Sequence, residues 1–134
     1  MMEKAKEILK TKKVFAVIGV TQDETKYGYE VFQSLKESGY KTYPVNPKYG
    51  EVAGTKCYAS LKDLPENPQV VIVTLSPVNT EKVIENFSKS QIQMLWLPPG
   101  CWSDFAIDKC QQMDIPFIHD VCPVVTLLAM REED

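Results

Sequence analysis

The sequence lacks any apolar segment that could cross a bilayer, and its first residues do not form a signal-peptide pattern. The longest apolar run, Val14–Val20, is far shorter than the roughly 20 residues that a transmembrane helix requires. Residues 1–13 mix lysine with glutamate and contain no apolar core. These features predict a cytoplasmic protein that does not associate with membranes.

Histidine is scarce, and the cysteines have no metal-binding spacing. The chain has one histidine, and none of its four cysteines belongs to a CxxC pair. Because a structural zinc site needs four such ligands at characteristic spacings, we expect no metal site. A domain of 134 residues does not depend on disulfides, so we expect reduced thiols at Cys57, Cys101, Cys110 and Cys122.

An excess of basic charge is also absent. The formal net charge is −3, whereas general nucleic-acid binders present a basic surface. We therefore expect no nucleic-acid partner. The remaining composition is that of an ordinary globular domain.

Apolar segments alternate with helical patterns along the chain, which is typical of a parallel sheet covered by helices on both faces. With right-handed crossovers, this pattern predicts a Rossmann-like, doubly wound α/β fold in three layers with strand order 3-2-1-4-5. The ligand crevice would then lie at the carboxyl ends of the first and fourth strands. The predicted strands are Val14–Val20, Lys41–Asn46, Val70–Leu75, Gln93–Leu97 and Ile115–His119.

The helical patterns divide the chain into an amphipathic helix within residues 1–13 and a single domain over residues 14–134. A capping box of Thr21 and Glu24 predicts that the next helix begins between Thr21 and Lys26. We expect residues 51–59 to be mostly loop. Further helices are predicted to begin at Ser60–Asp63 and to cover Thr80–Ser90, Ser103–Met113 and Val124–Met130.

The turn after the first strand is the first candidate binding element. Gly19 allows the strand to turn tightly, and the helix that follows offers free amides and a positive dipole end to a pyrophosphate. Thr21 adds a hydroxyl group and Lys26 a positive charge. The segment is not a GxGxxG motif, so an ordinary strand-to-helix turn remains an alternative interpretation.

The end of the second strand is the more informative element. In dinucleotide dehydrogenases this strand ends in Asp or Glu, which binds the ribose 2′-hydroxyl. Here Asn46 is followed by Pro47 and Lys48, so the carboxylate is missing and a cation stands nearby. This pattern favours a ligand with extra phosphate charge over NAD. The alternative is a turn with a solvated lysine.

His119 and Asp120 do not form a catalytic pair in this interpretation. Adjacent residues of a strand point to opposite faces of the sheet, so the two side chains should not meet. We expect a structural histidine and no catalytic residues.

Three segments together resemble a known family, the small single-domain CoA-binding proteins. That family shares its fold with the CoA-binding domain at the start of the succinyl-CoA synthetase alpha subunit. The resemblance covers nearly the whole chain after Lys13. It rests on Ala16–Val20 with the Asp23–Lys26 loop, on Gly39-Tyr-Lys-Thr-Tyr-Pro-Val-Asn-Pro47, and on Gly54-Thr-Lys-Cys-Tyr-Ala-Ser-Leu61.

The resemblance implies a CoA site and assigns roles to particular positions. The first loop would hold the CoA phosphates, Lys48 would contact a phosphate, and the end of the third strand would line the nucleotide or pantetheine path. Pro47 and Pro77 would form a wall for the adenine. The expected binding residues are Gly19, Thr21, Gln22, Asp23, Lys26, Asn46, Pro47, Lys48, Leu75, Ser76 and Pro77.

The sequence departs from the family pattern on the fourth strand. Family members commonly have Trp-x-Gln-x-Gly there, whereas this chain has Trp96-Leu-Pro-Pro-Gly100. Pro98 removes a side chain and an amide from the lip of the crevice. The phosphorylated histidine of the synthetase belongs to a further domain, which we do not expect in this chain.

The expected function is therefore non-catalytic binding of CoA or an acyl-CoA, with a protein partner or a homo-oligomer compatible with it. The alternative is a small NAD(P)-binding enzyme or a redox-sensing module. A phosphoacceptor signalling domain is disfavoured, because Thr21 and Ser76 stand where acidic residues would be needed.

Overall fold

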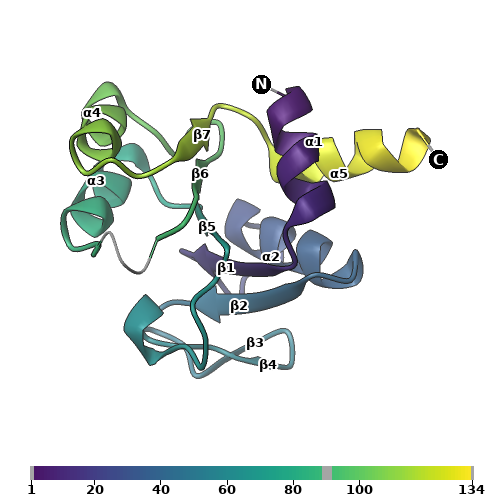
Figure 1. The fold of residues 1–134 in the computed structure, drawn as a ribbon. Coiled ribbons are helices and arrows are strands. Elements are labelled where there is room, and N and C mark those ends of the chain that lie inside the picture. Colours follow the sequence, from purple (N-terminus) through teal and green to yellow (C-terminus); the bar gives the residue numbers. More distant parts are fainter. Residues whose placement is uncertain (1, 89–91, 134) are drawn as a thin grey trace.

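The computed structural model describes residues 2–88 and 92–133, and its centre is a five-stranded parallel sheet (Figure 1). Helices cover both faces of this sheet, which confirms the predicted Rossmann-like α/β class. The spatial order is β2-β1-β5-β6-β7. These strands are β1 (Val14–Ile18), β2 (Lys41–Val45), β5 (Val70–Val73), β6 (Leu95–Leu97) and β7 (Phe117–His119).

The predicted strand order 3-2-1-4-5 is wrong in the place of the third long strand. β5 pairs directly with β1, so that Phe15 is opposite Val70 and Ile18 is opposite Val73. β2 is consequently an edge strand rather than an interior one. Pro44 within β2 gives the physical reason, because a residue without an amide N–H is tolerated at a sheet edge and not between two strands.

The corrected order also moves the crevice. In an open α/β sheet a ligand binds where the strand order reverses, outside the carboxyl ends of the strands. Here the order reverses between β1 and β5, since the chain continues from β1 to β2 on one side and then returns to β5 on the other. The crevice is therefore expected between the first and third long strands, not between the first and fourth.

The segment between β2 and β5 contains structure where mostly loop was predicted. A short antiparallel hairpin joins β3 (Glu51–Val52) to β4 (Thr55–Lys56). Its turn residues, Ala53 and Gly54, both have positive φ, the conformation required by the tight turns that suit hairpins. Tyr58 then covers the outer edge of β2, because its amide donates to the Pro44 carbonyl at 3.0 Å.

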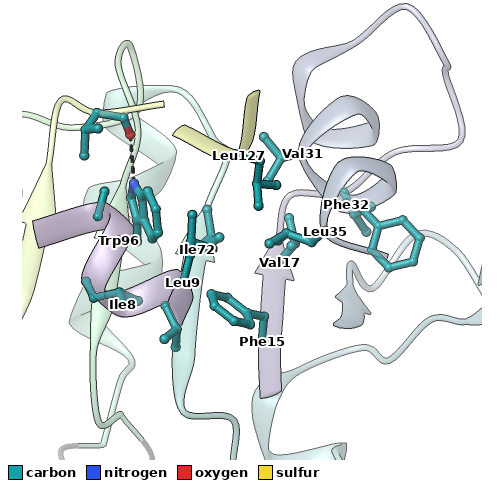
Figure 2. Close-up of a cluster of buried hydrophobic side chains, with 14 of the residues drawn as sticks. Ile8, Leu9, Phe15, Val17, Val31, Phe32, Leu35, Ile72, Trp96 and Leu127 are labelled. Atoms are coloured by element: carbon teal, nitrogen blue, oxygen red, sulfur yellow. Dashed lines mark hydrogen bonds between the residues drawn. The ribbon is translucent and has the colours of Figure 1, made fainter. Parts of the chain in front are cut away.

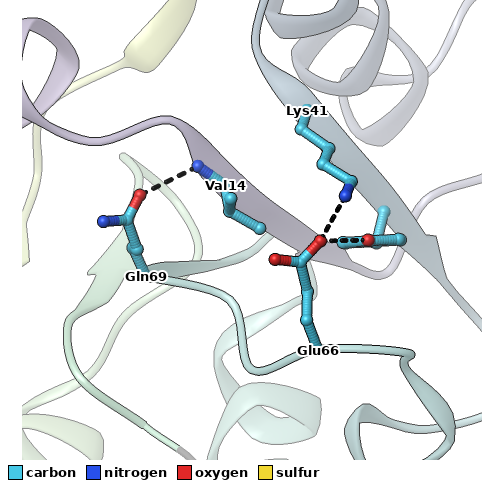
Figure 3. Close-up of polar contacts among 5 residues, drawn as sticks. Val14, Lys41, Glu66 and Gln69 are labelled. Atoms are coloured by element: carbon cyan, nitrogen blue, oxygen red, sulfur yellow. Dashed lines mark hydrogen bonds and ion pairs between the residues drawn. The ribbon is translucent and has the colours of Figure 1, made fainter.

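Polar contacts anchor the end of this segment at the amino edge of the sheet (Figure 3). The Gln69 side-chain oxygen accepts from the amides of Lys13 and Val14 at 2.7 and 3.1 Å. Glu66 accepts from the Tyr43 hydroxyl and pairs with Lys41, and these two partners hold the pKa of the Glu66 carboxyl below its usual value. The chain is thereby returned to the edge at which β5 must begin in order to run parallel to β1.

The helices form two layers. On one face α1 (Met2–Thr11) and α2 (Tyr27–Glu37) pack against α5 (Pro123–Glu132), and on the other α3 (Pro77–Glu85) packs against α4 (Asp104–Gln112). A 3-10 helix, η1 (Leu61–Asp63), precedes β5. None of the helices described in residues 2–88 and 92–133 is both long and apolar enough to span a membrane.

Two helix starts differ from the predictions for local reasons. α2 begins at Tyr27 because Thr21 forms no capping box, and its hydroxyl instead accepts from the Asp23 amide at 3.1 Å. α3 begins at Pro77 rather than Thr80, since proline is well suited to the first position of a helix. The predicted end of this helix at Ser90 lies outside the described residues.

The core on the α1, α2 and α5 face is built from alternate residues of the strands (Figure 2). Phe15, Val17 and Ile72 point to this face, while the residues between them point to the other. Trp96 is fully buried there, and its indole N–H donates to the Val121 carbonyl at 2.8 Å. Burial of this large ring therefore leaves no unsatisfied donor.

We expect Leu9→Ala to lower the free energy of unfolding by about 2–5 kcal/mol, since Leu9 is 1% exposed and joins α1 to the core. Lys4→Ala on the same helix is the matched control, because Lys4 is exposed and alanine suits a helix equally well. Urea denaturation of both variants measures the effect. A Leu9→Ala protein as stable as wild type would show that α1 does not contribute to the cooperative core.

Candidate functional site

The site is organised around a glycine turn at the carboxyl end of β1. Gly19 has φ +93°, and its amide donates to the Val45 carbonyl at 3.1 Å. A Cβ at this position would come within 2.7 Å of the Leu75 side chain. The turn therefore needs glycine both for its backbone conformation and for the space beside β5.

A second glycine brings α2 directly onto this turn. A Cβ on Gly28 would lie 2.6 Å from the Gly19 carbonyl oxygen and 3.0 Å from Thr74 Oγ1. Thr74, the residue after β5, closes the contact, because its amide and its hydroxyl both donate to the Ile18 carbonyl, at 2.8 and 3.0 Å. The amino end of α2 is thus held against the carboxyl ends of β1 and β5, where a helix offers amides and a positive dipole end to an anion.

Asn46 connects the turn after β1 with the turn after β2. Its side-chain amide donates to the Val20 carbonyl at 2.8 Å, and its side-chain oxygen accepts from the Lys48 amide at 2.9 Å. An aspartate could not make the first of these bonds, because an ionised carboxylate has no N–H to donate. Asn46 therefore has a structural reason to replace the acid found in dinucleotide dehydrogenases.

The loop between Gly19 and α2 is ordered by its own polar side chains. The Thr21 hydroxyl lies 3.3 Å from the Tyr49 hydroxyl, and the Gln22 side chain donates to the Glu51 carbonyl at 2.8 Å. Asp23 accepts from the amide and the hydroxyl of Thr25, and these bonds lower the pKa of the Asp23 carboxyl. Asp23 therefore stabilises the loop conformation. It also places a negative charge in the loop that precedes α2.

A cavity of about 620 Å³ opens beside the glycine turn, a volume typical of small-molecule sites. It lies between the carboxyl ends of β1, β2 and β5, the 3-10 helix η1, and α3 with the residues that follow it. Its lining is mostly apolar, with Lys62 as a cation on its border. The lining residues are Ile18, Gly19, Val45, Asn46, Pro47, Ala59, Ser60, Leu61, Lys62, Leu75, Val83, Asn86, Phe87 and Ser88.

The structure brings four of the predicted site residues together in the cavity wall: Gly19, Asn46, Pro47 and Leu75. Thr21 and Gln22 instead tie their loop to the segment after β2. The other predicted residues do not belong to the cavity lining. Asp23, Lys26 and Lys48 are exposed in the two turns, whereas Ser76 and Pro77 form the start of α3.

The second wall of the cavity was not identified from the sequence. Leu61 and Lys62 belong to η1, and Val83 and Phe87 come from α3 and the residue stretch after it. Val83 and Phe87 recur at helical spacing, which predicts that both face inward, but periodicity alone does not distinguish a core contact from a cavity wall. Both side chains are half-buried here.

The residues near the end of β7 are held by Trp102. The Asp120 carboxylate accepts from the Trp102 indole N–H at 3.2 Å, and the His119 ring makes an edge-to-face contact with Trp102 at 4.8 Å between centroids. Asp120 has φ +60°, so the chain leaves the strand geometry at this residue. Through these contacts, His119 and Asp120 both stabilise the structure at the carboxyl edge of the sheet.

The fold and the cavity together define a three-layered α/β domain of the Rossmann-like class, with a concave site at the reversal of strand order. The model of the CoA binding domain family matches residues 13–127. The chain therefore belongs to this family of CoA-binding-domain proteins, which confirms the resemblance seen in the sequence.

Individual relatives agree with this assignment. YneT of Bacillus subtilis, an uncharacterized protein, is 27% identical over 117 residues, 87% of each chain. An ADP-forming acetate–CoA ligase of Methanocaldococcus jannaschii is 35% identical over 81 residues, which make up 60% of this chain and 12% of the ligase. A hypothetical protein from Pyrococcus horikoshii has a structure with TM-score 0.88 and 29% identity, covering 98% of this chain and 92% of that one.

We expect Gly28→Ala to destabilise the protein by roughly 1–3 kcal/mol, although alanine is the better helix former. The added Cβ would lie 2.6 Å from a backbone oxygen, so α2 must move away from the Gly19 turn. Gly50→Ala is the control, since a Cβ there meets nothing within 4 Å. Thermal unfolding of both variants measures the difference, and a Gly28→Ala protein as stable as wild type would contradict the close approach.

Proposed function

We propose that the chain binds CoA or an acyl-CoA and takes no catalytic part itself. The observation that carries this proposal is the meeting of the Gly19 turn, the amino end of α2 and the 620 Å³ cavity at one edge of the sheet. An anion-binding element next to an apolar cavity matches a ligand that joins phosphates to an adenine ring. Membership of the CoA-binding-domain family supports CoA as that ligand.

The phosphates would lie against the amino end of α2. Gly28 holds this end on the Gly19 turn, and Lys26 immediately precedes the helix. The amides of the first helical turn and the Lys26 ammonium would then face the pyrophosphate.

The adenosine would occupy the cavity, with its ring between the apolar side chains of Leu61, Leu75 and Val83. The 3′-phosphate that distinguishes CoA would lie between two cations. Lys48 follows β2 with its ammonium 5.6 Å from the centroid of the Tyr49 ring, and Lys62 borders the cavity from η1. Either lysine can reach a phosphate oxygen without being buried, because its charge stays at the rim.

The pantetheine arm would follow the carboxyl edge of the sheet from Leu75 towards the turn after β6. Pro98 is buried in that turn and has no amide to offer, so hydrogen bonding to the arm must come from other residues. Space along this edge would decide whether an acyl group is accepted on the thiol.

The alternative of an NAD(P)-binding enzyme finds less support in the site. Both polar ends of the Asn46 side chain take part in joining two turns, by hydrogen bonds to Val20 and Lys48, and the side chain offers no carboxylate to a ribose hydroxyl. In a dehydrogenase the residue at this position binds the ribose of NAD, whereas here Asn46 joins two turns of the backbone.

We expect CoA to bind more tightly than dephospho-CoA, and NAD to bind weakly or not at all. The reason is that the 3′-phosphate would gain charge-assisted contacts to lysine that the other two ligands cannot make. Isothermal titration of the purified protein with the three ligands measures this order. Equal affinities for CoA and NAD would overturn the proposed function.

Replacing Lys48 by alanine should weaken CoA binding by about 1–3 kcal/mol and leave the melting temperature nearly unchanged, since Lys48 is exposed. We expect Lys62→Ala to weaken CoA as well. Lys4→Ala, an exposed lysine on α1, serves as the charge-matched control. If the affinity for dephospho-CoA falls as much as that for CoA, neither lysine contacts the 3′-phosphate.

A further inference from the structure

Two cysteines lie on the turns that follow the neighbouring strands β6 and β7, and neither belongs to the cavity lining. Cys101 lies in the turn after β6 and Cys122 precedes α5, after β7. Burial and the neighbouring Cys122 thiol raise the pKa of the Cys101 thiol to about 11. None of the four cysteines forms a disulfide in this structure.

The two loops that carry this pair are tied to each other by hydrogen bonds. The Asp120 amide donates to the Leu97 carbonyl at 2.9 Å, and the Trp102 indole donates to the Asp120 carboxylate at 3.2 Å. The Trp96 indole adds a third bond, to the Val121 carbonyl at 2.8 Å. Cys101 and Cys122 therefore belong to one cross-linked patch of structure after two neighbouring parallel strands.

The two thiols differ in accessibility. Cys101 is 5% exposed, whereas Cys122 is partly exposed. A disulfide arriving from solvent can therefore reach Cys122 first. Cys101 would react only in a second step.

Tyr27 connects Cys122 with the proposed phosphate site. Its hydroxyl donates to the Cys122 sulfur at 3.1 Å, a contact that stabilises negative charge on that sulfur during exchange. Tyr27 is the first residue of α2, directly between Lys26 and Gly28. The same helix end that would hold the CoA phosphates thus also positions a thiol at the sheet edge.

We propose that Cys122 and Cys101 form a thiol–disulfide exchange pair for the disulfide of CoA; this inference rests on the proposed function. The Cys122 sulfur attacks one sulfur of CoA disulfide, which forms a protein–CoA mixed disulfide and releases one CoA thiol. The Cys101 sulfur then attacks Cys122 in the mixed disulfide, and its proton passes to the second departing CoA. CoA disulfide is reduced to two CoA thiols, and the two cysteines are oxidised to one disulfide.

The other two cysteines provide internal controls. Cys57 is buried beside the turn after β2, and its sulfur contacts the Asn46 carbonyl at 3.5 Å. Cys110 is fully buried within α4. Neither has a partly exposed partner thiol in the described part of the chain, so neither is expected to exchange.

The test is incubation of the reduced, full-length protein with CoA disulfide, followed by intact and peptide mass spectrometry and a count of released CoA thiols. Wild type should release two CoA thiols per protein and end with a Cys101–Cys122 disulfide. The Cys101→Ser protein should stop at the mixed disulfide, with one CoA attached to Cys122. The Cys122→Ser protein should form neither the mixed disulfide nor the protein disulfide. Cys57→Ser should behave like wild type.

Two further measurements test whether the exchange is directed by ligand binding. Pantethine has the same reactive end as CoA disulfide but no nucleotide, so it should react at least about tenfold more slowly with wild type. Tyr27→Phe should slow the first exchange roughly three- to tenfold, which is the usual effect of losing one ordinary hydrogen bond. Equal rates for CoA disulfide and pantethine would overturn the proposal.

Calorimetry with reduced CoA separates the two ways in which the inference can fail. If CoA binds but Cys101→Ser collects no adduct on Cys122, the exchange pair is wrong and the proposed function stands. An adduct that persists on Cys122 of wild type, or one found on Cys57 or Cys110, also overturns the pair. If CoA does not bind, the proposed function fails together with this inference.

Discussion

The close approach of α2 to the turn after β1 is the constraint on which the site depends. A Cβ on Gly28 would collide with the Gly19 carbonyl oxygen, and Thr74, the residue after β5, closes the contact. Because the helix end cannot move away, its amides remain directed at the carboxyl edge of the sheet. The cavity, the pair of turns and the Tyr27–Cys122 contact are all placed relative to this junction.

Asn46 affects both the local structure and the ligand preference of the site. Its amide and its oxygen join the turns after β1 and β2, which requires a side chain that both donates and accepts. The same choice removes the carboxylate by which dinucleotide dehydrogenases bind ribose. Local architecture and ligand preference are thus coupled through a single side chain, and the neighbouring lysines supply the charge that an extra phosphate needs.

Much of the fold was readable from the sequence because its signals are local. The all-apolar run at β1, the glycine that follows it and the alternation of strands with helices predict the α/β class without tertiary information. The order of the strands was predicted wrongly, although Pro44 carried the missing signal. A proline without an amide N–H indicates an edge, and giving that signal its weight would have placed β2 outside and β5 beside β1.

The sequence by itself determined the glycine turn, the missing ribose acid and the cation after β2, since each of these is a property of residues adjacent in the chain. Only the tertiary structure decided which distant segments complete the site. The wall from η1 and α3, with Lys62 at its border, depends on how the segment after β2 returns to the sheet. The placement of Cys101 and Cys122 on neighbouring turns depends on the pairing of β6 with β7. Such contacts join residues far apart in sequence, and their geometry follows from helix packing and from the course of the connecting loops, which local patterns do not encode.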